Sequence, residues 1–254
     1  LDISSDDTNE ATIDLAQLTF TSANWNTPQT ITVTGIDDSI VADDTAVITV
    51  SINDAGSADE YDALADQAVV VTLTNDDVAV INISSGGITT TGITIDENGG
   101  TGVFSVELGA APLSDVVIDF GSNDTNEATV SPASLTFTSA NWDTPQTVTV
   151  TGVNDDIDKD DATTITISIN DALSDDAYDG VPDETAPITI TDDDSAAFTL
   201  SETTLTIDEN ASTDTFTVVL DSEPTSDVVL DISSDDTNEA TIDLAQLTFT
   251  SANW

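Results

Sequence analysis

The chain has 254 residues, with 50 Asp and Glu residues against a single basic one and a formal net charge of −49. This charge argues against nucleic acid and anionic lipid surfaces as partners, because both need positive charge on the protein. The sequence has no Cys, His or Met, which excludes disulfides, the usual zinc sites and the commonest general base. No run of about 18 apolar residues is present, so no part of this segment is expected to insert into a membrane. Apolar residues still make up 38% of the chain and fall in alternating runs, which favours folded cores over disorder.

The sequence repeats itself at two levels. Residues 1–25 recur unchanged as residues 230–254, and a diverged copy lies between them. The alignment with that copy runs without a gap from Leu1 to Asp77, each residue lying 117 positions before its counterpart. The unit is therefore about 115 residues long, and two slightly different units form a 229-residue super-repeat.

The repeat predicts three modules: the C-terminal part of one (1–77), a complete one (78–194) and the N-terminal part of a third (195–254). No Gly/Ser-rich or Pro-rich spacer separates them, so we expect the modules to follow one another end to end. Leu1 is not an initiator residue and no signal peptide is present, which indicates an internal window of a longer polypeptide. The alternative is a separate subunit whose incomplete ends are completed by neighbouring chains.

Within the complete module, short runs rich in Val, Ile and Thr alternate with turn residues, as in strands with one buried face. The predicted strands are 78–83, 91–95, 102–108, 115–120, 135–138, 146–151, 163–169 and 187–191. We expect the first two to be halves of one edge strand broken at Gly86-Gly87, and the weakly helical stretch Asp171–Ala177 to be loop. Seven or eight short strands in a unit of this length predict an all-β fold, with each module an antiparallel β-sandwich.

Aromatic residues supply the candidate core of the complete module. The bulky candidates are Phe104, Phe120, Phe137 and Trp142. Tyr61 and Tyr178 occupy equivalent places in acidic loops of successive modules. We expect both to be packing anchors rather than ligand contacts, because Tyr usually buries its ring and keeps its hydroxyl in water.

Three acidic motifs recur from module to module, each bordering a predicted strand: Asp-Glu-Asn early in the module, an Asp-rich loop after the Thr/Val strand, and a closing run of Asp. The candidate metal ligands are Asp37, Asp38, Asp43, Asp44, Asp76, Asp77, Glu97, Asp155, Asp156, Asp158, Asp160, Asp161, Asp192, Asp193, Asp194, Asp208 and Glu209. Strands that run the same way place their matching ends at one pole of a sandwich, where the three loops could converge.

Clustered carboxylates and flexible loop carbonyls suit Ca²⁺, which takes six to eight oxygen ligands, better than Mg²⁺, which keeps its waters. The competing explanation is that the loops are only solvated and that the acidity is an adaptation to salty surroundings. Because three motifs are repeated in register, we favour bound calcium.

The acidic motifs also carry a family resemblance. The chain resembles the Calx-beta domain of sodium–calcium exchangers, integrins and many bacterial surface proteins. The matching features, in the family's order, are Leu135–Phe137, Thr147–Val150, Asp155-Asp156, Asp160-Asp161 and Asp192–Asp194. The resemblance implies a seven-stranded, Ig-like sandwich with calcium at one pole, near the junction with the next module. The family's Asp-Tyr before the Phe strand is missing, and Asp124 and Glu127 stand nearby as alternative replacements for its ligand.

The leading functional hypothesis is a structural one. The sequence suits a repeat segment of a long extracellular adhesin stalk or fibre, bacterial and at the cell surface or in a biofilm matrix, with calcium at the junctions setting rigidity. One alternative is a filament subunit that polymerises non-covalently by strand exchange. Others are a carboxylate glycosidase and a Thr-rich face for sugars or ice. No enzyme is predicted, because abundant acids give no distinctive catalytic pair and no His or Cys is present.

Overall fold

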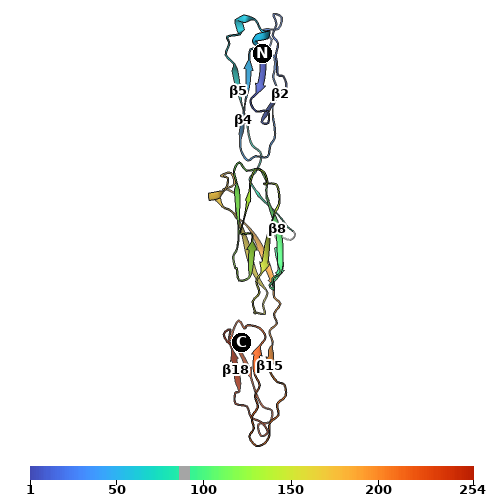
Figure 1. Ribbon diagram of the computed structural model, residues 1–254, viewed down its shortest axis with the longest axis vertical. Helices are drawn as coiled ribbons and strands as arrows, with labels where there is room; N and C mark the ends of the chain where they lie inside the picture. Colours follow the sequence, from blue (N-terminus) through green and yellow to red (C-terminus); the bar gives the residue numbers. More distant parts are fainter. Residues whose placement is uncertain (86–91) are drawn as a thin grey trace.

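The computed structural model describes residues 1–85 and 92–254, and nearly all of its regular structure is β, as predicted. Figure 1 shows β-rich units placed end to end along one axis, with the N-terminus in one outer unit and the C-terminus in the other. Residues 1–77, 78–194 and 195–254 are called below the N-terminal, central and C-terminal segments. Among the described residues, each sheet lies within one of these segments. The segment boundaries themselves remain a prediction from the repeat.

The central segment is a sandwich of two sheets, with strand orders β10-β12-β8-β6 and β11-β9-β13-β14-β7. Its strands are β6 (Ile81–Ser85), β7 (Ile93–Asp96), β8 (Thr101–Leu108), β9 (Val116–Ser122), β10 (Ala128–Ser131), β11 (Ser134–Phe137), β12 (Gln146–Gly152), β13 (Asp161–Ile169) and β14 (Glu184–Thr191). Neighbouring strands are antiparallel, apart from β7 and β14, which run parallel. The predicted antiparallel sandwich is therefore confirmed.

Inward-facing residues of both sheets form one hydrophobic core. The alternation seen in the sequence of β12 is preserved, since Val148 is fully buried, while Thr147 is exposed and Thr149 is partly buried. Phe104 and Phe120 meet edge to face across the core, with ring centroids 5.9 Å apart. Phe137 is also fully buried, and Trp142 packs against this core from a partly buried position. The four predicted core aromatics are thus confirmed.

The central segment differs from the predicted strand pattern in three places. Strand β10 has no counterpart among the predicted strands, because only Ala128 of its four residues is buried and no alternation marks it. The two halves of the edge strand, β6 and β7, belong to different sheets, while the proposed break at Gly86-Gly87 lies outside the described residues. These features give nine strands in the described part of this segment, instead of the seven or eight predicted. A short 3-10 turn, η3 (Asp171–Leu173), begins the stretch expected to be loop.

The N-terminal segment repeats part of this sandwich. Its elements are β1 (Asp2–Ser5), β2 (Ala11–Ile13), β3 (Val33–Gly35), β4 (Asp44–Ser51), η1 (Asp54–Gly56), η2 (Asp59–Tyr61) and β5 (Gln67–Leu73). The sheets β1-β4-β5 and β2-β3 correspond to β9-β13-β14 and β10-β12 of the central segment. Its core is small, with Ile3, Leu18 and Ile48 at the centre. It contains no sequence that corresponds to β6, β7 or β8.

The C-terminal segment holds the complementary part. Its strands are β15 (Phe198–Leu200), β16 (Val218–Leu220), β17 (Val228–Asp231) and β18 (Gln246–Phe249), paired as β15-β16 and β17-β18. They correspond to β6, β8, β9 and β11, because Phe198 faces Leu220 as Ile81 faces Leu108. In residues 1–85 and 92–254, no helix has the length and apolar character needed to cross a membrane.

Candidate metal centre

The parallel pairing of β7 with β14 brings two acidic motifs together. Ile95 lies opposite Ile190, and one step further the backbone N–H of Glu97 donates to the carbonyl of Thr191 at 3.1 Å. Because parallel strands end at the same edge of a sheet, Glu97 lies beside the closing residues Asp192–Asp194. The early Asp-Glu-Asn motif and the closing Asp run therefore meet at one pole, as the sequence predicts.

Two glycines allow the turn after β7, which carries Glu97, to approach the other sheet closely. The turn after β7 contains Gly99, whose φ of +76° is a left-handed conformation that glycine adopts without strain. At Gly152, the last residue of β12, a Cβ atom would lie only 2.3 Å from the carbonyl oxygen of Asp96. The backbone N–H of Gly152 donates to the carbonyl of Gly100 at 2.9 Å. The turn that carries Glu97 is thus fixed against the start of the Asp-rich loop.

Glu97 is the most deeply buried acid of this pole, with only 3% of its surface exposed. Its Oε1 atom is buried without a hydrogen-bond partner, and so is Oδ2 of Asp194. Glu97, Asp192 and Asp194 each offer a carboxylate oxygen within 4.8 Å of the others. Three carboxylates at this distance repel one another, and buried polar atoms without partners are costly. The arrangement is what a bound cation would stabilise.

The electrostatics of these carboxylates agree with that interpretation. Burial, together with the charges of Asp155 and Asp192, raises the pKa of Glu97 to about 7, although a hydrogen bond from the backbone of Asp193 acts to lower it. Burial also raises the pKa of Asp194, together with the charges of the neighbouring aspartates. Both carboxyl groups are therefore held in surroundings that disfavour their charged form.

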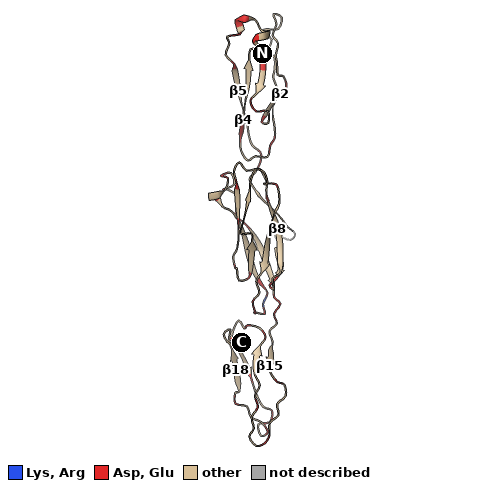
Figure 2. Ribbon diagram, viewed as in Figure 1, with Lys and Arg blue, Asp and Glu red and all other residues tan. Residues whose placement is uncertain are grey.

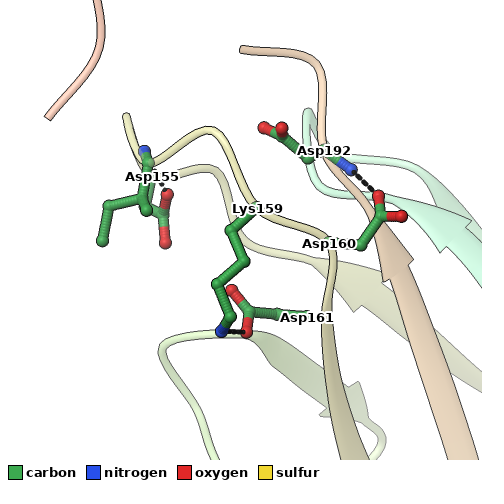
Figure 3. A network of polar contacts seen from close by, with 6 residues as sticks. Asp155, Lys159, Asp160, Asp161 and Asp192 are labelled. Atoms are coloured by element: carbon green, nitrogen blue, oxygen red, sulfur yellow. Dashed lines mark hydrogen bonds and ion pairs between the residues drawn. The ribbon is translucent and has the colours of Figure 1, made fainter. Parts of the chain in front are cut away.

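A second acidic cluster lies at the same pole. Glu127, Asp155 and Asp161 also have carboxylate oxygens within 4.8 Å of one another. Figure 3 shows that the side chain of Lys159 reaches Asp161, with which it forms an ion pair, while Oδ1 of Asp160 accepts the backbone N–H of Asp192 at 3.0 Å. Burial, followed by the charges of Asp161 and Asp155, raises the pKa of Glu127. The one basic side chain of the protein therefore lies at its most acidic loop.

The N-terminal segment carries a matching cluster of Glu10, Asp38 and Asp44, again within 4.8 Å. These are the counterparts of Glu127, Asp155 and Asp161 at the constant spacing of 117 residues. An open hollow of about 480 Å³ lies over this pole, and six acids line it: Glu10, Asp37, Asp38, Asp44, Asp76 and Asp77. Ala42 stands where the central segment has Lys159, so this cluster has no internal ammonium group.

The structure sorts the seventeen predicted ligands into four groups. Glu97, Asp192, Asp194, Asp155, Asp161, Asp38 and Asp44 belong to the three clusters. Asp37, Asp76 and Asp77 line the hollow of the N-terminal segment, while Asp43, Asp158, Asp160 and Asp193 accept hydrogen bonds from Asn75, Ala196, Asp192 and Asn98. Asp156, Asp208 and Glu209 are in no cluster, and the last two are exposed in the C-terminal segment.

Two cluster members were not among the predicted ligands, Glu10 and Glu127. The sequence leaves Asp124 and Glu127 as alternatives, and the structure places Glu127 in the cluster, because the N–H of Val153 donates to its carbonyl at 2.9 Å. Asp124 instead accepts the backbone N–H of Asn126 at 3.0 Å. The repeat itself is the signal that identifies Glu10, since it is the aligned counterpart of Glu127.

The acidic loops also form the seams between segments. The carbonyl of Asp156 accepts the N–H of Glu223 at 2.6 Å, and Oδ2 of Asp158 accepts the N–H of Ala196 at 2.6 Å. The preceding seam repeats the first contact, since the carbonyl of Ser39 accepts the N–H of Ala111 at 2.6 Å. Each acidic pole therefore faces the segment that follows it along the rod. Figure 2 marks the acidic residues of the chain in red.

The donor set fits a hard divalent cation. The residues that would hold it at the deeper cluster are Glu97, Asp192 and Asp194, with backbone carbonyls and water completing the shell that Ca²⁺ prefers. The two buried carboxylate oxygens without partners are the observation that supports this fit. The cation would neutralise negative charges whose oxygen atoms lie within 4.8 Å of one another.

No protein-family model and no curated protein sequence matches this chain. Among solved structures, domains 4 and 5 of the S-layer protein SbsC match at 19% identity and a TM-score of 0.36, over 75% of this chain and 70% of that one. Domains 1–6 of SbsC match at 18% identity and a TM-score of 0.36, over 91% of this chain and 25% of that one. The E. coli chaperone DraB matches at 8% identity and a TM-score of 0.30, over 44% and 54%. No function is transferred from similarities of this size.

Proposed function

We propose that the chain is a structural repeat segment of a long extracellular, calcium-stabilised stalk or fibre. In this proposal Ca²⁺ binds the acidic pole of each complete module and fixes its orientation to the next module. The observation that carries the proposal is the buried carboxylate of Glu97, whose Oε1 atom has no partner although Asp192 and Asp194 lie within 4.8 Å. A buried acid surrounded by acids is stable as an anion only beside a cation.

The proposed effect on shape follows from the position of the cluster. Asp194 lies two residues before Ala196, whose backbone is already hydrogen-bonded to the acidic loop through Asp158. Without a cation, the carboxylates on both sides of this seam repel and the joint can bend. With the cation bound, the closing Asp run and the loop turn about Glu97 are held together, and the next module starts in a fixed direction.

Repetition supports a mechanical role over a catalytic one. The cluster around Glu127 recurs around Glu10, and the same 25-residue sequence occurs at both ends of the chain. A spacer needs length and stiffness, both of which repeated modules supply by addition. An active site gains nothing from being copied along a rod.

Calorimetric titration of the whole 254-residue chain with CaCl₂ tests this function. We expect saturable binding for the wild type, and loss of the tightest class of sites when Glu97→Gln and Asp194→Asn are combined. The matched control changes two acids outside the clusters, Glu107→Gln and Asp176→Asn, and is expected to bind like the wild type. Equal calcium binding by the cluster variant and the wild type would refute the assignment.

A further inference from the structure

The N-terminal seam, between the N-terminal and central segments, and the C-terminal seam, between the central and C-terminal segments, are formed by equivalent loops. Each has a pole loop and a facing loop: residues 36–44 with 109–115 in the N-terminal seam, and 153–161 with 221–227 in the C-terminal seam. Both pole loops make the same turn, in which Oδ1 of Asp38 or Asp155 accepts the backbone N–H two residues later, at 2.8 and 2.7 Å. One backbone hydrogen bond of 2.6 Å joins pole loop to facing loop in each seam. The seams therefore share a backbone and differ in their side chains.

The side chains that meet in the N-terminal seam are apolar. Val41 of the pole loop is partly buried and packs against the hydrophobic core of the central segment. Ile40 forms a parallel bridge with Ala111, and the backbone N–H of Val41 donates to the carbonyl of Ala111 at 3.4 Å. Ala110 and Ala111 of the facing loop are both buried, with 0% and 8% of their surface exposed. Val41 therefore extends the core of the central segment across the seam.

The central segment holds this facing loop in place from its own side. Tyr178 is fully buried, and its hydroxyl donates to the carbonyl of Ala110 at 2.5 Å. The expectation that this hydroxyl stays in water is therefore wrong for Tyr178. Near the other end of the loop, the carboxylate of Asp175 accepts the backbone N–H of Ser114 at 2.8 Å. Val41 thus packs against a loop that is fixed by buried hydrogen-bond partners.

The equivalent positions of the C-terminal seam are acidic. Asp158 stands in the place of the valine, and its Oδ2 atom accepts the backbone N–H of Ala196 at 2.6 Å. Glu223 stands in the place of the second alanine, and its N–H donates to the carbonyl of Asp156 at 2.6 Å. The side chains of Asp156 and Asp158 are exposed, so water reaches this contact. The pole loop and the facing loop have thus both changed from apolar to acidic.

The charges across the two seams differ in the same direction. The pole loop of the N-terminal seam contains four acids and faces a loop with one, whereas that of the C-terminal seam contains five acids and faces a loop with three. Lys159 forms its ion pair with Asp161, within its own pole loop. Facing carboxylates repel, and at about 0.1 M salt this repulsion acts over about 10 Å. The C-terminal seam therefore has the stronger repulsion and lacks the valine contact that opposes it.

We propose that the two seams are joints of different kinds: the N-terminal seam is an apolar lock that keeps its angle without any cation, and the C-terminal seam is an acidic hinge that bends when its charges are not neutralised. Neighbouring domains move relative to one another unless a hydrophobic interface holds them. The N-terminal and central segments then move as one body, and the C-terminal segment turns about the hinge. Closing of the hinge by calcium rests on the proposed function, whereas the difference between the seams does not.

Pairs of nitroxide labels measure each seam separately, because the chain has no cysteine of its own. The pair Thr72→Cys with Thr136→Cys spans the N-terminal seam, and Thr189→Cys with Thr248→Cys spans the C-terminal seam. All four are exposed strand residues, and the two pairs occupy equivalent places in the repeat. The pair Thr136→Cys with Thr189→Cys lies within the central segment and gives the width that the labels themselves contribute. Double electron–electron resonance on the whole chain yields the distance distribution of each pair.

In chelator at low salt, we expect the distribution across the C-terminal seam to be about twofold broader than that across the N-terminal seam. Val41→Asp should broaden the N-terminal seam, because it places a carboxylate at the contact with the core. Asp158→Val combined with Glu223→Ala installs the residues of the lock and should narrow the C-terminal seam. Val103→Asp makes the same exchange as Val41→Asp at an exposed residue of β8 and is expected to leave both seams unchanged.

The proposal is overturned if both seams give equal widths in chelator, if Val41→Asp leaves the N-terminal seam as narrow as in the wild type, or if the double variant leaves the C-terminal seam as broad. Narrowing by the double variant cannot result from unfolding, so the test does not depend on how well Val41→Asp folds. Adding CaCl₂ to the labelled wild type separates this proposal from the proposed function. A C-terminal seam that stays broad in calcium would refute the proposed function and leave the difference between the seams intact.

Discussion

Glu97 shows how one residue can be costly alone and useful with a cation. Its side chain is 3% exposed and one of its oxygens has no partner. An isolated buried carboxylate destabilises a fold, while a carboxylate that binds a cation links folding to binding. The same side chain is therefore expected to act in opposite directions with and without calcium.

The variant Glu97→Gln tests this reversal. In chelator at pH 8 it should stabilise the central segment by about 1–3 kcal/mol, because a buried charge is removed. In saturating calcium it should be less stable than the wild type, because a ligand is lost. Thermal denaturation in both buffers measures the two differences, with Glu107→Gln as the control. A variant that is less stable in both buffers would contradict the account of this residue.

Asp175 is also a buried acid, but in contrast to Glu97 its carboxylate oxygens accept hydrogen bonds from backbone N–H groups. Burial alone would raise its pKa, but backbone N–H groups of Ala177 and Ser114 donate to its carboxylate at 3.0 and 2.8 Å and hold the pKa below the usual 3.8. A carboxylate with a lowered pKa in the folded state adds stability above the pKa of the unfolded chain. That stability is lost as the pH falls through the folded-state pKa.

We predict that Asp175→Asn destabilises the central segment by about 2 kcal/mol at pH 7, because hydrogen bonds to a charged acceptor are lost. The difference from the wild type should shrink as the pH falls below 3.8, where the wild-type carboxyl also becomes protonated. Denaturant unfolding at pH 7 and pH 3 checks both statements. Asp176→Asn, at an exposed neighbour, is the control. A cost that does not change with pH would show that the charge is irrelevant.

At the scale of elements, alternation in the sequence was sufficient for most strands, but it missed β10 and did not reveal which sheet β7 joins. Strand β12 alternates between buried Val and exposed or partly buried Thr, as its sequence indicates. Strand β10 has one buried residue, and its place is fixed by pairing Ala128 with Gly152, a contact that no local pattern encodes. The parallel partner of β7 is likewise set by a strand about ninety residues away in the chain.

Because local sequence patterns do not encode contacts between distant strands, only part of the site could be predicted. The closing Asp run and Glu97 were identifiable because their motifs recur beside strand ends. Glu127 was ambiguous with Asp124, because its position beside Asp155 depends on β10, which the sequence pattern does not reveal. Residues such as Asp156 were included among the ligands because sequence shows acidity but not the direction of a side chain.

Strand β8 offers a matched pair of substitutions. Phe104→Ala should destabilise the central segment by about 3–5 kcal/mol, the usual cost of removing a fully buried aromatic side chain. Its counterpart Phe216 is 37% exposed, so Phe216→Ala should destabilise the C-terminal segment by less than half as much. Denaturant unfolding in chelator measures both. Equal destabilisation by the two substitutions would mean that the cores of the two segments are equally complete.

At the scale of the whole molecule, the repeat determines where each acidic pole meets the next segment. Each seam contains an equivalent backbone hydrogen bond of 2.6 Å. It joins Asp156 to Glu223 in the seam after the central segment and Ser39 to Ala111 in the seam before it. Their chemistry differs, because the first seam joins acidic residues and the second joins Ser39 to an alanine. The dependence of shape on cations should be greatest at the seam that follows the central segment, because the buried cluster of Glu97, Asp192 and Asp194 lies there.

Small-angle scattering of the whole chain in calcium and in chelator, at low protein concentration, is the most direct measurement of this account. We predict a straight rod in calcium and a shorter, broader distribution of distances in chelator, because the unneutralised seam bends. The variant combining Glu97→Gln with Asp194→Asn should no longer respond to calcium. Identical profiles for the wild type in both buffers would contradict the claim that bound calcium holds the modules in line.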